Sequence, residues 1–235
     1  MPRLGEALRA VVSDKEEALE IKGRPESVLM SPTRQRIFEQ ICHYPASRLK
    51  TISKKLGMNA TVVQFHLRKM RQHQYASSSQ IDGNTVYYPF DLRPTDYDVA
   101  SLSVLADDTG RELLKLVVET PGLTASELAL KTKKSTVGIR KYLLEMESLG
   151  LVALIIDGRR NRVFPGEGLP RVEKRSRHLL RGLKSRLMRR LARDRLSPSI
   201  EMDERRESII ILKVGGRSHR LKLPAESLLP WGASR

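Results

Sequence analysis

The sequence predicts a mainly α-helical protein with small β elements, an α+β fold in which one unit of roughly 60 residues occurs twice. Three observations predict it. The phrase IDGNTVYYP at 81–89 returns almost unchanged as IDGRRNRVFP at 156–165. The apolar residues of 45–75 coincide with those of 121–151 when the two segments are aligned without a gap. Lys and Arg also exceed Asp and Glu, which gives a net charge of +16.

The alignment that places Pro45 on Pro121 brings apolar residues together in pairs. One extra residue then enters the second hairpin, after which Pro89 meets Pro165. Few residues are identical, so the shared apolar skeleton and the shared turn are the evidence for a duplicated unit. The coinciding pairs are Ile52 and Leu128, Val63 and Ile139, Leu67 and Leu143, Met70 and Met146, and Tyr75 and Leu151.

Each unit contains the same succession of elements. Apolar residues at helical spacing predict first helices over 33–43 and 107–120, and short second helices near 48–56 and 124–132. Third helices begin after Asn59 and Ser135, whose side chains can accept hydrogen bonds from the first turn of a helix. Two β runs joined by Asp-Gly then predict a hairpin. Three helices followed by a hairpin form a winged helix-turn-helix.

SPTRQRIFEQI, followed by MNATVVQFHLRKM and a glycine hairpin ending in YYP, resembles the winged-helix transcriptional regulators of archaea, which are similar to the ArsR and MarR groups. The resemblance covers roughly residues 31–165 and is stronger in the first unit. In the second unit Tyr142-Leu143-Leu144 replaces His-Leu-Arg. The resemblance implies a DNA-binding regulator.

The charge distribution and the predicted elements divide the chain into five parts. The segment 169–199 has eleven basic and two acidic residues, a net +9, and 31–98 has ten and five, a net +5. The predicted parts are an N-terminal helical extension (1–30), the first winged helix domain (31–98), the second (99–168), a basic amphipathic helix (169–199), and a C-terminal β-hairpin with a tail (200–235).

The composition limits the possible functions. A sequence pI of about 10.3 is typical of proteins that bind polyanions. The single cysteine, Cys42, excludes an internal disulfide or a cysteine-cluster zinc site, and we expect it to be a small core residue. No catalytic motif, metal-ligand spacing or cofactor signature is present, so we expect no enzyme, metal or cofactor. An N-terminus without a signal-peptide core and the lack of a long apolar stretch predict a cytoplasmic, nucleoid-associated protein.

The first recognition helix, 60–73, has a face suited to the major groove. With Val63, Leu67 and Met70 directed inward, the outward residues are Thr61, Phe65, Arg68 and Gln72, with Gln64 and Lys69 beside them. Arg pairs with guanine, Gln pairs with adenine, and Thr or Phe contacts a thymine methyl group. Phosphate contacts are expected from Lys50, Lys54 and Lys55, and further DNA contacts from Asn59 and Asn84.

The second recognition helix differs, because Val137 and Leu144 are directed outward with Lys141 and Ser148. Its wing is more basic, however. One interpretation is that this wing binds the DNA backbone or minor groove while the helix binds a protein; the other is that Leu144 packs on a neighbouring segment. The predicted DNA-contacting residues of this copy are Lys133, Lys134, Arg140, Lys141, Arg159, Arg160 and Arg162.

Within 169–196 a stripe of four leucines lies at helical spacing: Leu180, Leu183, Leu187 and Leu191. Three interpretations remain open. The stripe dimerises the protein, which we favour; it packs on the winged helices and leaves the arginines along DNA; or the helix rests on an anionic membrane, where it lacks a Trp or Phe anchor.

The C-terminal part contains SIIILKV and RSHRLKL on either side of Gly215-Gly216, which predicts a two-residue hairpin. Two strands alone are marginally stable, so the hairpin requires a helix, another strand or a second subunit.

The sequence as a whole predicts a sequence-specific double-stranded DNA-binding transcription regulator built on tandem winged helices. Two alternatives remain: a sequence-independent architectural or nucleoid protein, and an adaptor of the transcription machinery that docks proteins.

Overall fold

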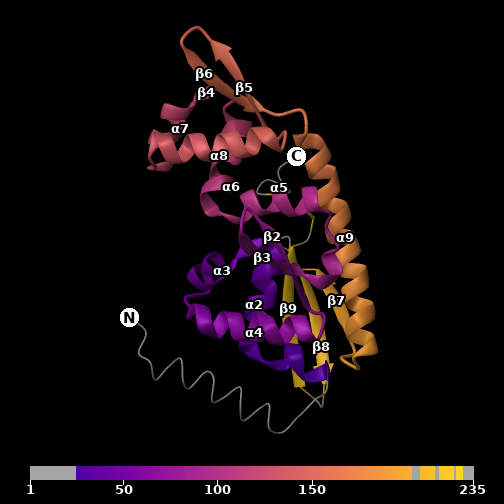
Figure 1. Ribbon diagram of the computed structural model, residues 1–235. Coiled ribbons are helices and arrows are strands. Elements are labelled where there is room, and N and C mark those ends of the chain that lie inside the picture. The colour runs from indigo at the N-terminus through magenta and orange to yellow at the C-terminus, as the bar shows by residue number, and fades with distance from the viewer. Residues whose placement is uncertain (1–24, 203–206, 215–216, 225, 230–235) are drawn as a thin grey trace. The chain divides into compact units, whose positions relative to one another are not determined.

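The computed structural model describes residues 25–202, 207–214, 217–224 and 226–229 (Figure 1). The chain divides into two compact units, the first formed by 1–93 with 181–225 and the second by 94–180 with 226–235. Of the predicted extension 1–30, residues 1–24 lie outside the described residues, and residues 25–30 form a 3-10 helix. The Gly215-Gly216 turn and the last six residues also lie outside them.

The first unit begins with the succession of elements expected of a winged helix. Ser31 caps its first helix, and Pro32 occupies the first helical turn, where a missing N–H costs nothing. Strands β1, β3 and β2 lie in that order in an antiparallel sheet. The elements are α2 (Pro32–His43), β1 (Ser47–Arg48), α3 (Leu49–Leu56), α4 (Ala60–Gln72), β2 (Ala76–Ile81) and β3 (Asn84–Pro89), followed by the 3-10 helix η2 (Phe90–Leu92).

The second unit repeats this order after one additional helix, which the sequence analysis missed. Its sheet has the same strand order, β4-β6-β5. The elements are α5 (Asp96–Ala106), α6 (Asp108–Glu119), β4 (Leu123–Thr124), α7 (Ala125–Thr132), α8 (Thr136–Ser148), β5 (Val152–Asp157) and β6 (Arg160–Pro165), and α9 (Leu169–Arg193) begins in this unit. Both units therefore contain a winged helix-turn-helix, and the predicted fold class is confirmed.

The predicted apolar pairs occupy the same places in both cores. All ten residues of the five aligned pairs are buried, with at most 2% of each exposed. The predicted caps are also present, because the Asn59 side chain accepts from the Thr61 N–H at 2.8 Å and the Ser135 hydroxyl accepts from the Gly138 N–H at 3.2 Å. The apolar skeleton is therefore the part of the duplication that both folds share.

One detail of the second wing differs from the prediction. The first wing turns at Asp82 and Gly83, both with positive φ, as a type I′ turn requires. In the second wing Asp157 still pairs with Arg160 inside the sheet, so Gly158 and Arg159 form the turn. The two hairpins therefore align without an extra residue. Gly158, which has a positive φ, takes the first position of its turn, whereas Gly83 takes the second position of the first turn.

The C-terminal hairpin is one part of a larger sheet. Strands β8 (Glu207–Val214) and β9 (Arg217–Pro224) pair as predicted, and a third strand, β7 (Ser199–Met202), pairs with β8. Within the first unit β9 lies against α2, and the Lys222 N–H donates to a Glu39 carboxylate oxygen at 2.7 Å. The hairpin thus obtains the additional strand and helix that two isolated strands lack.

The last turns of α9 are fixed within the first unit by buried polar contacts. Arg190 forms a two-pronged ion pair with Asp91, at 2.7 and 3.1 Å, and both side chains are less than 9% exposed. This pairing raises the pKa of Arg190. The Tyr75 hydroxyl donates to Asp194 at 2.7 Å, and Lys184 Nζ donates to the Ser208 hydroxyl at 2.7 Å. These contacts hold α9 against η2 and β8.

The leucine stripe of α9 is not a surface. Leu180, Leu183, Leu187 and Leu191 are all buried, each with at most 1% exposed. The predicted dimer through these residues is wrong, because the chain itself already covers them. The segments 169–199 and 200–235 are likewise not separate parts, since α9 and the C-terminal sheet complete the two units.

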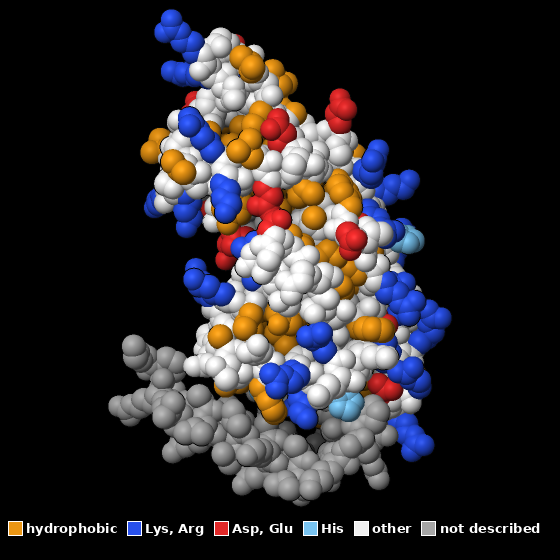
Figure 2. All heavy atoms as spheres, in the orientation of Figure 1, with side chains coloured by type: hydrophobic (Ala, Val, Ile, Leu, Met, Phe, Trp, Pro, Cys, Tyr) orange, Lys and Arg blue, Asp and Glu red, His pale blue; other side chains and the backbone are white. Residues whose placement is uncertain are grey.

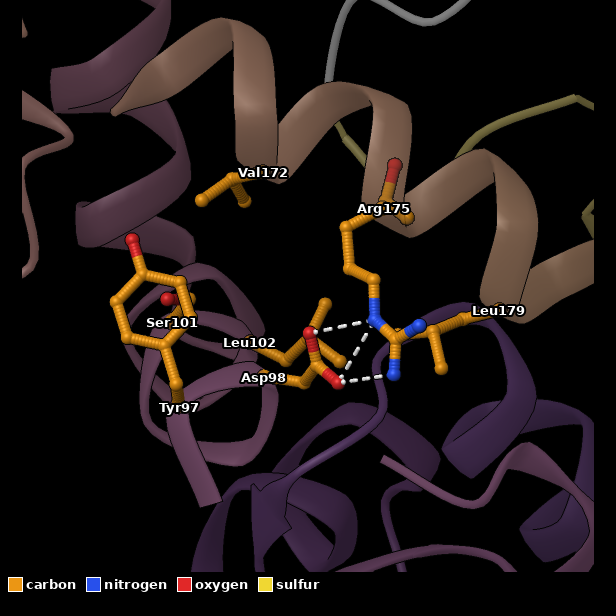
Figure 3. Close-up of a pocket in the computed structure, with 8 residues that line it drawn as sticks. Tyr97, Asp98, Ser101, Leu102, Val172, Arg175 and Leu179 are labelled. Atoms are coloured by element: carbon orange, nitrogen blue, oxygen red, sulfur yellow. Dashed lines mark hydrogen bonds and ion pairs between the residues drawn. The ribbon is translucent and has the colours of Figure 1, made fainter. Parts of the chain in front are cut away.

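Within the second unit α9 is joined to α5 by an ion pair (Figure 3). The Arg175 guanidinium contacts both carboxylate oxygens of Asp98 at 3.0–3.1 Å, and Asp98 also caps α5 together with Thr95. Burial raises the pKa of Asp98, but hydrogen bonds from Arg175 and Thr95 outweigh it, so the pKa is lowered. The adjacent cavity, about 10 Å³, has the size of one water molecule. This place therefore joins two helices and does not form a ligand pocket.

Candidate nucleic-acid interface

The outward face of α4 is exposed as the helical spacing predicts. Val63, Leu67 and Met70 are buried on the inner side, as is His66, which the sequence analysis did not place. Phe65 is 43% exposed, and its ring contacts the His66 ring edge-on with 5.2 Å between centroids. The exposed residues of the outer face are Thr61, Gln64, Phe65, Arg68, Lys69 and Gln72.

The helix-turn-helix that bears this face carries charges of one sign. No Asp or Glu occurs between Glu39 and Asp82, a stretch that contains all of α3 and α4. Lys50 and Lys54 are exposed on α3, the helix that precedes α4 in the helix-turn-helix. A positive helix-turn-helix surface attracts phosphates and favours binding of a polyanion.

Two side chains of the first winged helix that were expected to contact DNA form contacts within the protein. Lys55 is half-buried, and its ammonium group lies over the Tyr44 ring at 3.7 Å from the centroid, which binds the cation to the fold. The Asn59 side-chain oxygen caps α4, so only its amide nitrogen could face a ligand. Asn84 is exposed at the wing, where its amide nitrogen donates to the Asp82 carbonyl oxygen at 3.0 Å.

The counterpart face of α8 has a different chemistry. A constant offset of 76 residues relates the copies, so Val137 stands where Thr61 does and Leu144 stands where Arg68 does. Val137 is 79% exposed and Leu144 is 60% exposed, so the alternative in which Leu144 packs on a neighbouring segment is wrong. The remaining exposed apolar residues of this winged helix are Leu130, Ile155 and Ile156.

A groove of about 510 Å³ lies between α8, the wing and the start of α7. Its basic residues are Arg140 from α8 and Arg159 and Arg160 from the wing, all exposed. Leu144 and Leu154 also line it. Lys133, Lys134 and Lys141 are exposed elsewhere on the same helix-turn-helix, and Lys133 has the left-handed conformation that ends α7.

The third predicted wing arginine, Arg162, forms contacts within its own domain. Arg162 Nε contacts Asp157 at 2.5 Å, and its guanidinium donates to the Gly122 carbonyl oxygen at 3.0 Å. The hydrogen bond and charge of Asp157 raise the pKa of Arg162. Arg162 thus joins β6 to its own hairpin and to the loop before β4, and its contact with DNA stays a prediction.

Several expectations concern features away from these surfaces. Cys42 is fully buried, as expected of a core residue, and burial raises the pKa of its thiol well above the usual range. No group of three or more His, Cys, Asp or Glu residues that could hold a metal ion occurs in the described part of the chain. Among the described helices, none is long and apolar enough to span a membrane.

Comparison with known proteins places this fold beside helix-turn-helix regulators. A curated protein of Methanocaldococcus jannaschii, named as an uncharacterized HTH-type transcriptional regulator, is 24% identical over 149 residues. The chain is similar to winged-helix transcriptional regulators. The match spans 63% of this chain and 37% of the relative's length, and the relative is not named as an enzyme. No family model matches the chain.

Two solved structures are reported among the similar ones. An ArsR-like transcriptional regulator from Rhodococcus sp. RHA1 is 28% identical, with 41% of this chain and 88% of that chain covered and a TM-score of 0.34. A MarR family protein of Mycobacterium tuberculosis is 25% identical, with 42% and 76% covered and a TM-score of 0.26.

Proposed function

We propose that the protein is a sequence-specific double-stranded DNA-binding transcription regulator in which the first winged helix reads the bases. The observation that carries the proposal is the outward face of α4, whose exposed polar and aromatic residues lie in a stretch without acids. The printed name of the M. jannaschii relative supports the regulatory part.

In this proposal α4 enters the major groove. Arg68 pairs with the O6 and N7 atoms of a guanine, and Gln64 or Gln72 pairs with an adenine. Phe65 and the Thr61 methyl group contact thymine methyl groups. Lys50 and Lys54, on the preceding helix, bind phosphates and fix the position of α4 along the groove without reading sequence.

The second winged helix contributes affinity through its wing. Arg159 and Arg160 are exposed beside Arg140 in the groove next to α8, where they can neutralise phosphates of either strand. Leu144 replaces the arginine that would read a guanine there, so we assign no base reading to α8.

The first test is selection of bound sites from random duplex DNA, followed by Arg68→Ala. We expect one preferred motif, and we expect the variant to lose preference at one base position. Arg220→Ala, an exposed arginine of β9 in the same unit, is the matched control. If selection yields no motif and Arg68→Ala weakens binding to all sequences equally, the architectural alternative is correct instead.

A second candidate function, docking of a protein, is favoured by the exposed aliphatic residues of the second winged helix. Figure 2 shows hydrophobic side chains at the surface over α7 and α8, next to Lys and Arg. Exposed apolar groups of this extent in one small domain indicate an interaction site. A segment with aliphatic and acidic side chains would match Leu144 and Leu154 beside the arginines of the groove.

The double variant Val137→Ser with Leu144→Ser tests whether the exposed face of α8 is free for a protein or contacts DNA. If α8 docks a protein, DNA affinity and site preference remain those of the unmodified chain. A loss of DNA affinity as large as that from removing the wing arginines would assign this helix to DNA and exclude the docking role.

A further inference from the structure

Helix α9 has one buried side and one basic side. The buried side consists of the leucine stripe with Leu169, Val172 and Leu179. The exposed side carries Arg171, Lys174 and Arg177 in the half that belongs to the second unit, and Arg181, Arg189 and Arg193 in the half that belongs to the first. Lys and Arg side chains follow α9 at the surface (Figure 2).

The fold uses a different set of α9 cations. Arg175 pairs with Asp98, Arg190 pairs with Asp91, and Arg186 donates to the Asp91 and Leu92 carbonyl oxygens. These three residues hold the helix in place. The exposed set contributes little of this kind: within the described residues Arg171, Lys174 and Arg181 have no ion-pair partner, and Arg177 pairs only with Glu173 on the same helix.

Arg193 also pairs with Asp194, at 3.4 Å, but the exposed cations repel one another more than these few contacts offset. Like charges three or four residues apart repel on a helix, and Arg171 with Lys174, Arg177 with Arg181, and Arg189 with Arg193 are such pairs. Glu173 is the acidic residue on this side, while Asp194 is buried under the helix end. A bound polyanion would remove this repulsion in each half of the helix.

The chemistry of the face identifies the polyanion. Its exposed residues contain no Phe, Tyr or Trp for stacking on a base and no Asn or Gln for a base edge, and a single imidazole, that of His178, lies among the cations. A membrane surface would require apolar anchors, and the exposed large apolar residues of the described chain all lie outside α9. Long, exposed guanidinium and ammonium groups on a regular helix suit phosphates of a duplex backbone.

We propose that the exposed face of α9 is an additional, sequence-independent site for the phosphate backbone of double-stranded DNA. The choice of DNA as the ligand rests on the proposed function. The site itself is separate from the recognition helices and wings. It supplies affinity for any duplex and leaves the choice of sequence to α4. Each half of the helix carries three of these exposed cations, so each half contributes by itself.

The test compares three variants with equal charge loss. One replaces Arg171, Lys174 and Arg177 with Gln, and a second replaces Arg181, Arg189 and Arg193 with Gln. The control replaces three exposed cations elsewhere, Lys115, Lys213 and Arg220, with Gln. Binding to a random-sequence duplex of about three helical turns is measured by fluorescence anisotropy across a salt series, with a thermal melt of each variant to verify folding.

Each α9 variant is expected to flatten the plot of log affinity against log salt by up to about 2.7, since each lost phosphate contact removes about 0.9. The control should keep the slope of the unmodified chain. Equal slopes for the α9 variants and the control would overturn the proposal, because general charge would then explain the binding. So would variants that keep the DNA slope but lose binding to vesicles containing phosphatidylserine.

The same experiment separates this proposal from the proposed function. An unmodified chain with no sequence preference, whose slope still falls in the α9 variants, refutes sequence-specific regulation and leaves the α9 site standing. If the unmodified chain has a preferred motif and the α9 variants bind as tightly as before, the α9 site is refuted and sequence-specific regulation stands.

Discussion

The two winged helices share a core and differ at the surface. Every aligned apolar pair is buried in both, yet the outward face of α4 bears Thr61, Phe65 and Arg68 where α8 bears Val137, Lys141 and Leu144. Burial constrains a side chain on all sides, whereas an exposed position is constrained only by what it binds. The difference between the copies therefore supports the proposal that they bind different partners.

The charges follow the same division. The first helix-turn-helix contains no acid, while the second contains Glu127, Glu145 and Glu147. Its wing nevertheless carries Arg159 and Arg160, where the first wing has Gly83 and Asn84. In the proposed function the first copy presents its recognition helix to DNA, and the second copy presents mainly its wing.

The largest expected effect tests the shared core. Leu67→Ala and Leu143→Ala remove counterpart residues, each at most 2% exposed, and each should lower the free energy of unfolding of its unit by about 2–5 kcal/mol. Chemical denaturation followed by circular dichroism measures both. A cost several times larger in one unit than in the other would show that the cores are less alike than their burial indicates.

The next effect tests the difference between the recognition helices. Arg68→Ala should weaken binding to the preferred site by about 1–3 kcal/mol and relax specificity at one position. Leu144→Ala, at the counterpart position, should change neither quantity. Anisotropy with the selected and a scrambled duplex measures both variants. Similar losses in the two variants would mean that both helices read bases.

A smaller effect is expected from the second wing. Replacing Arg159 and Arg160 with Gln should weaken binding to all duplexes alike and flatten the salt dependence by about 1.8. Arg162→Gln is a poor third member, because it would also remove the contact with Asp157. An unchanged slope in the double variant would place this wing away from DNA.

The smallest effect concerns the start of the second helix in each copy. Thr124 donates backbone and hydroxyl hydrogen bonds to Glu127, which lower the pKa of Glu127, whereas α3 begins at Arg48 without a side-chain cap. A lowered folded-state pKa contributes stability that is present above the unfolded pKa and is lost as pH falls through the folded pKa. Glu127→Gln should therefore lower the melting temperature slightly at pH 7, and the difference should shrink below about pH 4. A difference that persists at low pH would assign the effect to packing.

Much of this architecture could be predicted, because it rests on local signals. Apolar spacing located the six helices of the two winged helices within about two residues, and Asn59 and Ser135 marked the starts of α4 and α8. Exposure of the recognition faces also followed from spacing alone. The second turn was shifted by one residue because Asp-Gly signals two alternative turn registers.

What the sequence could not provide depends on distant partners. Lys55 was expected to contact phosphates, but its ammonium group lies over the Tyr44 ring. Arg162 was expected on the wing surface, and its guanidinium also contacts Asp157 and the Gly122 carbonyl oxygen. The four-residue strand β7 carries too little periodicity to be seen. The leucine stripe predicted an interface correctly, but spacing cannot distinguish a neighbouring segment of the same chain from a second subunit.

The buried bond between Tyr75 and Asp194 joins residues 119 positions apart. On a ribosome that adds about 5–20 residues per second, the partner of Tyr75 emerges roughly 6–24 s after it. Most of the second core, from Val104 to Val172, is synthesised within that interval. The first unit, although most of it is encoded first, therefore cannot be complete until residues 181–225 have been made, and by then most of the second core has already been synthesised.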